Sequence, residues 1–356
     1  MTLRVAIIGA SFARDAYLPA FAQVADAEVV AIASARLESA QSVAEKFGIP
    51  NAYDDWRAML DKHEVDIVGV VTPPVYHCEM TLEAIARNAH VICEKPMSMN
   101  ADESYRMLEA AEAKGRLHMM GHELRFNPNR RKIRQLIADG AIGEIRHINV
   151  VNINAGGDPK SRPAWHWWAM ENMGGGVLGA NGSHQIDLLR FWLGDIAEIS
   201  GHVGTLVKNR IGKDTGEPWT PTADDQANFT AIMANGTLAS VFMSSAARHT
   251  FGNHVQIYGS EGTIMLSNDD EKLRMARPGE DYQDISETDP NAGLPGVGKG
   301  IWNVSFVSLV REFTDAAREG RKLNWGATFA DGLKTQQAMD AIKRSWNERR
   351  WVQLDS

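Results

Sequence analysis

The stretch VAIIGASFAR, residues 5–14, decides how the first part of this chain is expected to fold. Its apolar run predicts a buried β-strand, and Gly9 follows in a tight turn that leads into a helix. A dinucleotide-binding domain begins in this way, with the pattern G-x-G-x-x-G in the turn. Here Ser11 and Arg14 occupy the second and third glycine positions. Because a serine hydroxyl can donate to a phosphate, we predict that Gly9, Ser11, Phe12 and Arg14 hold a dinucleotide.

Short apolar runs alternate with helical patterns over the first third of the chain. Strands that alternate with helices predict a parallel sheet buried on both faces. We therefore predict a doubly wound α/β domain over residues 1–121. After the opening strand, the expected strands are 28–34, 66–72 and 90–96, and the expected helices are 37–48, 55–63, 76–88 and 101–115.

The remaining residues, 122–356, show a different pattern. The turn pairs Asn235-Gly236 and Glu261-Gly262 lie between apolar runs, which is typical of β-hairpins. We predict a second α/β domain with a large, mainly antiparallel sheet that is open on one face. Its expected strand-like stretches are 144–154, 226–234, 236–245, 253–266 and 272–278, and its expected helices are 127–143, 304–320 and 325–347.

The composition argues against several classes of protein. The 356 residues carry a net charge of −8, so the chain lacks the basic surface of a nucleic-acid-binding protein. Cys78 and Cys93 form no CxxC pair, which favours free thiols in a reducing compartment. The histidines show no metal-ligand spacing, and no apolar run predicts a signal peptide or a membrane span. We expect a cytoplasmic protein that uses no metal and contacts neither nucleic acid nor membrane.

The second strand ends in IASAR, which bears on the choice of dinucleotide. NAD-binding enzymes place an acidic residue here, on the adenosine ribose. This chain has Ser34, followed by Arg36. A serine can hydrogen-bond a 2′-phosphate and an arginine can pair with it, so we predict a preference for NADP(H), with NAD(H) as the other possibility. The alternative is that Arg36 only covers the solvent side of a helix.

Two further loops follow predicted strands. In TPPVYH, residues 72–77, two prolines end a strand sharply, so Thr72, Pro73 and His77 are expected near the cofactor. The alternative is a stiff turn without contact.

The second of these loops is CEKP, residues 93–96, which places Lys95 at the carboxyl end of a strand. Burying an ammonium group is costly, so we predict that Glu94 and Lys95 lie near a ligand. The alternative is a surface lysine paired with Glu94.

A glycine-rich loop precedes a helix in GGGVLGANGSHQIDLLRFWLG, residues 174–194. The helix is expected to start at 181–183, which places His184 in its first turn. Asp187 follows one turn later on the same side, where it can orient the imidazole.

Together, the TPP..H loop, EKP (94–96), RFNP (125–128) and GGG…GSHQID (174–187) resemble the Gfo/Idh/MocA family of oxidoreductases over the whole chain. The resemblance implies a Rossmann domain and an α/β domain whose open sheet forms dimers or tetramers. It also implies hydride transfer between a nicotinamide and a secondary alcohol of a sugar, cyclitol or similar polyol. Lys95 matches the family lysine that polarises the substrate oxygen, and His184 matches the acid/base.

The chain departs from the family pattern at Ala180, where the family often has aspartate. The proton path then depends on Lys95 and His184, with Asn181 or Glu123 assisting. We predict that Glu123, Asn181, Asp187 and Trp165 contact the substrate. The tryptophan suits a sugar ring or an aromatic substrate such as a cyclic dihydrodiol, and the alternative is that it packs in a core or an interface.

Two other functions remain open from the sequence. One is a redox-assisted eliminase or glycosidase that retains its cofactor, in which a ring carbon is oxidised, elimination follows and the hydride returns. The other is a dinucleotide sensor without catalysis, which the loss of the family aspartate makes conceivable.

Overall fold

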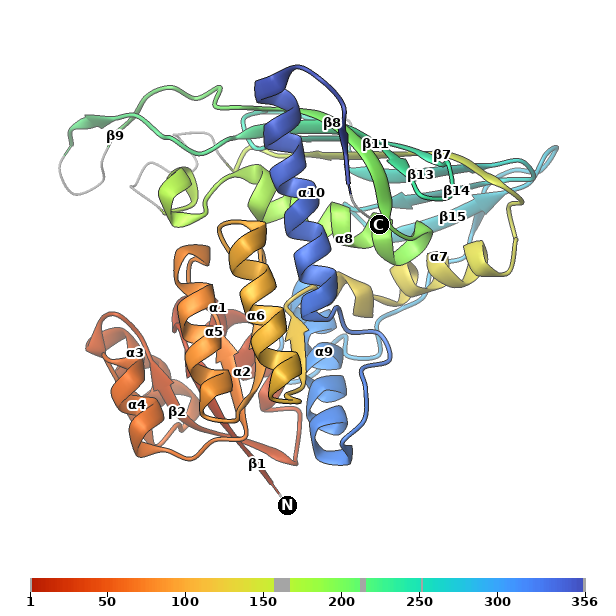
Figure 1. The fold of residues 1–356 in the computed structure, drawn as a ribbon. Coiled ribbons are helices and arrows are strands. Elements are labelled where there is room, and N and C mark those ends of the chain that lie inside the picture. Colours follow the sequence, from red (N-terminus) through yellow and green to blue (C-terminus); the bar gives the residue numbers. More distant parts are fainter. Residues whose placement is uncertain (1, 157–166, 212–215, 251, 355–356) are drawn as a thin grey trace. The chain divides into compact units, whose positions relative to one another are not determined.

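The computed structural model describes residues 2–156, 167–211, 216–250 and 252–354. The chain divides into two compact units (Figure 1). The first unit consists of residues 1–127 and 289–333, and the second of residues 128–288 and 334–356. Each unit is built on its own sheet.

In the described part of the first unit, six parallel strands form one sheet, in the order β3-β2-β1-β4-β5-β6. The predicted doubly wound parallel sheet is therefore confirmed. In such a sheet, ligands bind outside the carboxyl ends of the strands, where the strand order reverses. The sequence does not predict β3, because three residues show no periodicity. The strands are β1 (Leu3–Ile8), β2 (Ala27–Ala33), β3 (Asn51–Tyr53), β4 (Ile67–Val70), β5 (His90–Cys93) and β6 (His118–Met120).

The helices of the first unit agree with the predicted segments, except directly after β1. There the expected single helix is broken at Ala16, whose φ of −128° is not helical. The second piece is anchored by Tyr17, whose side chain is fully buried. The helices are α1 (Ser11–Asp15), α2 (Tyr17–Phe21), α3 (Leu37–Phe47), α4 (Trp56–Lys62), α5 (His77–Ala86) and α6 (Ala101–Ala113).

Helix α9 (Ile301–Glu319) also belongs to the first unit, although it follows the second sheet in the chain. Figure 1 shows it in blue beside the orange and red elements of that unit. Phe306, Leu309 and Phe313 repeat at helical spacing, and they are fully buried in the same core as Ile7. The two units are therefore discontinuous, which differs from the predicted continuous domains 1–121 and 122–356.

A sheet of nine strands runs through the described part of the second unit, in the order β16-β15-β14-β13-β7-β12-β11-β8-β17. Only β12 and β7 pair in parallel among these strands, so the predicted, mainly antiparallel sheet is confirmed. The predicted hairpin turns at 235–236 and 261–262 join antiparallel neighbours. The sequence misses β8, because Gly201 and Gly204 weaken its strand pattern. The strands are β7 (Ile145–Ile153), β8 (Ile196–Gly204), β11 (Gln226–Met233), β12 (Leu238–Ser244), β13 (His254–Gly259), β14 (Thr263–Ser267), β15 (Lys272–Ala276), β16 (Gln283–Asp284) and β17 (Val352–Gln353).

Three longer helices contribute to the second unit: α7 (Pro128–Ala138), α8 (Ser183–Leu193) and most of α10 (Phe329–Glu348). A short π-helical turn, η5 (Leu178–Gly182), leads directly into α8. Within the described ranges, no helix is both long and apolar enough to cross a membrane.

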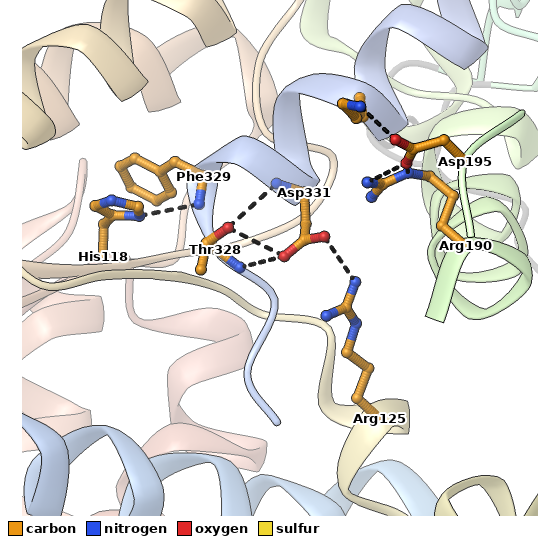
Figure 2. Close-up of polar contacts among 8 residues, drawn as sticks. His118, Arg125, Arg190, Asp195, Thr328, Phe329 and Asp331 are labelled. Atoms are coloured by element: carbon orange, nitrogen blue, oxygen red, sulfur yellow. Dashed lines mark hydrogen bonds and ion pairs between the residues drawn. The ribbon is translucent and has the colours of Figure 1, made fainter. Parts of the chain in front are cut away.

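The start of α10 is fixed by a reciprocal cap (Figure 2). The Thr328 N–H and Oγ1 both donate to Asp331 Oδ2, at 2.9 and 3.0 Å, and the Asp331 N–H donates back to Thr328 Oγ1 at 3.3 Å. Arg125 lies 3.3 Å from the other oxygen of Asp331. The Phe329 N–H donates to His118 Nδ1 at 3.0 Å, and the two rings are stacked. These contacts tie the helix start to β6.

We predict that His118 makes the stability of the chain depend on pH. Burial lowers the pKa of His118 from 6.5 to about 4, and Nδ1 accepts the Phe329 N–H only while it carries no proton. At pH values between about 4 and 6.5, His118 is protonated in the unfolded chain but largely unprotonated in the folded chain, so the folded chain binds fewer protons. The free energy of unfolding therefore falls as the pH falls from about 6.5 to about 4, by about 3 kcal/mol at most.

Urea unfolding at several pH values measures this effect. In His118→Gln, the loss of unfolding free energy between neutral pH and about pH 5 should be smaller than in the wild type. The exposed His249 gives a control, since His249→Gln should retain the wild-type pH dependence. Equal pH dependence in wild type and His118→Gln would contradict the prediction.

Candidate functional site

The turn after β1 is built around Gly9, whose φ is +109°. Its N–H donates to the Ala33 carbonyl at 2.8 Å. A Cβ at this position would lie 2.1 Å from the main-chain oxygen of Val71, so only glycine fits. The turn therefore packs directly against the residue that follows β4, and it leaves the start of α1 at the carboxyl edge of the sheet.

The residues that replace the missing glycines lie on α1. Ser11 is exposed at its first position. Arg14 is half exposed, and its guanidinium forms an ion pair with Asp15 at 2.9 Å. Phe12 stacks on Trp302 of α9, with ring centroids 5.7 Å apart. The sequence does not point to Trp302, because it lies 290 residues further along the chain and only folding brings it here.

Ser34 and Arg36 follow β2, as predicted. The Ser34 N–H donates to the Tyr53 carbonyl at 3.0 Å, which fixes the start of this loop. Arg36 is exposed and extended, and its carbonyl accepts from the Ser39 N–H at 3.0 Å as α3 begins. No carboxylate of the described residues forms an ion pair with Arg36. A hydroxyl and a guanidinium, without an acidic residue at the strand end, form a donor set that fits a phosphate.

His77 joins the loop after β4 to the loop after β5. Its Nε2 lies 2.7 Å from the Thr72 carbonyl oxygen, and its Nδ1 lies 3.0 Å from that of Pro96. The ring is fully buried, and this burial lowers its pKa. The imidazole therefore lies between two main-chain carbonyl oxygens, one in each loop, and the neutral ring donates its single N–H to one of them. Pro73 caps the short turn η1 (Pro74–Tyr76) in the first of these loops.

Glu94 and Lys95 follow β5, but their side chains have different surroundings. Glu94 is buried, with Oε1 accepting from the Tyr17 hydroxyl at 2.8 Å and Oε2 from the Lys95 N–H at 3.2 Å. Burial raises its pKa to about 6. A Cβ at Gly121 would lie 2.5 Å from Oε1, so the fold leaves space for this carboxyl group. Lys95 itself is half-buried, with its main chain held by Glu94.

In the second unit, α8 begins at Ser183, within the predicted helix start at residues 181–183, but a π-helical turn that the sequence does not predict precedes it. The chain is already helical from Leu178, because η5 precedes α8, and the Ser183 hydroxyl donates back to the Gly179 carbonyl at 2.7 Å. The glycines at 179 and 182 hide this turn in the sequence. His184 still lies in the first turn of α8. Its side chain is 8% exposed.

The remaining predicted substrate residues belong to different units. Asp187 is buried on α8. Glu123 is buried at the start of η2 (Glu123–Phe126) in the first unit. Trp165 lies outside the described residues.

A cavity of about 320 Å³ lies within the second unit, a size that suits a small ligand. Asn181 lines it, and so does Ala180, at the position where the family often has aspartate. The sequence does not predict most of the polar groups of this cavity, because they come from separate segments of the chain. The adjacent carboxylates in PTADDQ are the feature of the sequence that could indicate a polar site here. The lining residues are Asn154, Gly156, Trp168, Ala169, Gly176, Val177, Ala180, Asn181, Arg210, Pro221, Ala223, Asp224, Asp225 and Ser245.

The structure thus brings four predicted groups to one edge of the first sheet. Gly9, Ser34, Thr72 and Lys95 follow β1, β2, β4 and β5, and the carboxyl ends of parallel strands meet at the same edge. In the second unit, Asn181 and His184 lie on the same helical stretch.

Comparison with known proteins agrees with this architecture. Residues 3–122 match the model of an oxidoreductase family with an NAD-binding Rossmann fold, and residues 130–265 match that of the GFO/IDH/MocA C-terminal domain. Levoglucosan dehydrogenase of Pseudarthrobacter phenanthrenivorans is 28% identical, over 99% of this chain and 98% of its own length. Glucose-fructose oxidoreductase domain-containing protein 2 of Xenopus laevis is 30% identical, over 89% of this chain and 85% of its own.

A solved structure has the same fold as this chain. Levoglucosan dehydrogenase in complex with NADH and L-sorbose has a TM-score of 0.90 and 26% identity, over 100% of both chains. The matched domains define an NAD-binding oxidoreductase with a Rossmann fold. Within that class, the chain belongs to the Gfo/Idh/MocA family.

We predict that Gly9→Ala disrupts the cofactor turn far more than Gly48→Ala. Both glycines have positive φ, +69° at Gly48 and +109° at Gly9, and alanine in the left-handed conformation of Gly48 costs about 1–2 kcal/mol. A Cβ at Gly48 meets nothing within 4 Å, whereas at Gly9 it meets the Val71 oxygen. The unfolding free energy of Gly9→Ala should therefore fall by a further 1–3 kcal/mol, roughly, and dinucleotide binding should be lost. Urea unfolding measures the loss of unfolding free energy in both variants. Equal losses in Gly9→Ala and Gly48→Ala would show that the close approach of Gly9 to the Val71 oxygen is unimportant.

Proposed function

We propose that the chain is an NADP(H)-dependent oxidoreductase for a sugar, cyclitol or related polyol. It transfers hydride between the nicotinamide and a secondary alcohol, or the corresponding carbonyl. The observation that carries this proposal is that both family domains are present, with Lys95 after β5 and His184 in the first turn of α8. The names of several relatives support the substrate class, among them levoglucosan dehydrogenase and the myo-inositol 2-dehydrogenase of Thermotoga maritima, which is 25% identical over 75% of this chain.

In this proposal, Lys95 and His184 act on the same substrate hydroxyl. The bound nicotinamide supplies the hydride acceptor or donor. The Lys95 ammonium donates a hydrogen bond to the substrate oxygen and stabilises negative charge that develops there. The His184 imidazole removes the hydroxyl proton during oxidation and returns it during reduction, a task that suits a group whose ordinary pKa is near neutrality.

The surrounding residues hold this machinery in position. Glu94 and Tyr17 fix the main chain at Lys95 through the hydrogen bonds at 3.2 and 2.8 Å. His77 contacts the Thr72 carbonyl in the loop after β4 and the Pro96 carbonyl in the loop after β5. Rigid support of this kind keeps a reacting group within the small distance that hydride and proton transfer require.

We also propose that the open face of the second sheet joins copies of the chain into dimers or tetramers. Along β12, Ala239 and Val241 are buried while Leu238 and Phe242 are each 42% exposed. Large apolar side chains on one face of a sheet favour burial in an interface.

For the cofactor, Arg36→Ala should weaken NADPH binding by roughly 10- to 100-fold, because it removes a charged partner of the 2′-phosphate. NADH, which lacks that phosphate, should lose little affinity. Fluorescence titration with both cofactors measures the two dissociation constants. Arg57→Ala provides the control, since Arg57 is an exposed arginine on α4 that stacks on Trp56. Equal losses for NADPH and NADH in Arg36→Ala would overturn the proposed phosphate site.

For the proton transfer, His184→Gln should reduce kcat by about 10²–10⁴-fold. Its affinity for the reduced cofactor, titrated in parallel, should remain close to that of the wild type. His254→Gln on β13 should retain full activity, which controls for the loss of a histidine from the same unit. A His184→Gln enzyme with more than about a tenth of wild-type kcat would remove this residue as the acid/base.

A further inference from the structure

The carboxylate of Asp224 lines the cavity of the second unit, and neighbouring loop residues hydrogen-bond to this aspartate. Asp224 lies two residues before β11, and its side chain is half-buried. Its Oδ2 accepts from the Leu178 N–H at 2.8 Å, and its main-chain oxygen accepts from the Val177 N–H at 3.0 Å. Asp224 is therefore held against the start of η5, the turn that leads to His184.

The glycine loop leaves space for this side chain. Gly176 has a φ of +117°, and a Cβ there would lie 2.3 Å from Asp224 Oδ1. A larger residue would push the carboxylate away from its position or distort the turn. The last glycine of GGG thus allows a carboxylate to line the cavity.

The neighbouring Asp225 has a different role. Its two oxygens accept from the main-chain N–H groups of Leu206 and Val207, at 2.6 and 2.8 Å. Its carbonyl accepts from the Ser245 N–H at 2.8 Å. Asp225 therefore shapes the walls of the cavity. A carboxylate has about four acceptor positions, so the bond from Leu178 leaves Asp224 with capacity for a ligand.

The other lining groups suit a neutral, hydroxylated ring. Asn154 accepts the Gly156 N–H with its amide oxygen at 2.8 Å, and it lines the cavity with an amide whose nitrogen is a donor. Asn181 adds a second amide, and the half-exposed Trp168 adds an aromatic surface. The Lys343 ammonium on α10 interacts electrostatically with Asp224, so the charge of Asp224 does not require a cationic ligand.

We propose that Asp224 is a substrate-binding residue that accepts a hydrogen bond from a ring hydroxyl of the polyol. The inference rests on the proposed function, since the ligand is the polyol of that reaction. Burial raises the pKa of Asp224 to about 6, which indicates that water solvates this carboxylate poorly. In such surroundings a hydroxyl that donates to it is bound more strongly than in water.

The test compares Asp224→Asn with the wild type. Asparagine retains an oxygen for the Leu178 N–H and has a similar size beside Gly176, so the loops should fold unchanged. Glu280→Gln is the control, because Glu280 is exposed in the same unit and does not line the cavity. The probes are levoglucosan, myo-inositol and L-sorbose, titrated by calorimetry into the NADPH-loaded chain.

The proposal predicts that at least one probe binds the wild type and Glu280→Gln equally, and binds Asp224→Asn about 10- to 100-fold more weakly. Among the monodeoxy analogues of that probe, one should bind the wild type and Asp224→Asn alike, because it lacks the hydroxyl that donates to Asp224. Equal binding of the parent probe by Asp224→Asn and wild type would overturn the proposal.

Binding of none of the three probes would overturn it as well. Titration with NADPH and with NADH separates this failure from that of the proposed function. A chain that binds a reduced dinucleotide but no probe retains its assignment as a dinucleotide enzyme and loses the role of Asp224. A chain that binds neither NADPH nor NADH contradicts the proposed function, while the same probe titration on the unloaded chain still decides the role of Asp224.

Discussion

The fold of the first unit depends on one close approach, between Gly9 and the main-chain oxygen of Val71. It presses the turn after β1 onto the residue after β4, at the point where the strand order of the sheet reverses. Parallel pairing then determines what else reaches that edge. Ser34 and Lys95 lie there because they follow β2 and β5, and buried contacts from His77 and Tyr17 hold the loops in place. A dinucleotide site can therefore form without the second and third glycines of the fingerprint.

A second close approach of a glycine shapes the second unit. There the close approach is between Gly176 and the carboxylate of Asp224, beside a π-helical turn that leads into α8. Such turns are frequent at functional sites, because they present groups that a regular helix would bury or turn away. The result is a polar cavity next to the helix that carries His184. Binding of substrate and removal of its proton are thus assigned to adjacent parts of one supersecondary element.

The sequence predicts those features that depend on local pattern. The parallel sheet follows from alternating strands and helices, and the hairpins follow from the turn pairs at 235–236 and 261–262. The roles proposed for Lys95 and His184 start from short motifs. The sequence does not predict features that depend on distant packing. Helix α9 joins the first core through Phe306 and Phe313, and Trp302 reaches Phe12 only after folding. Asp224 likewise becomes part of a site only when its segment packs on Gly176, and its neighbour Asp225 looks the same in the sequence.

The measurement that tests the account most directly is the reduction of NADP⁺ and NAD⁺ by the purified chain with a panel of cyclic polyols. Formation of reduced nicotinamide is followed by its absorbance, and the carbonyl product is identified by mass spectrometry. We expect net reduction with at least one cyclic polyol, faster with NADP⁺ than with NAD⁺. Cleavage of a glycosidic bond without net change in the nicotinamide, or no reaction with any polyol while both cofactors bind, would contradict this expectation.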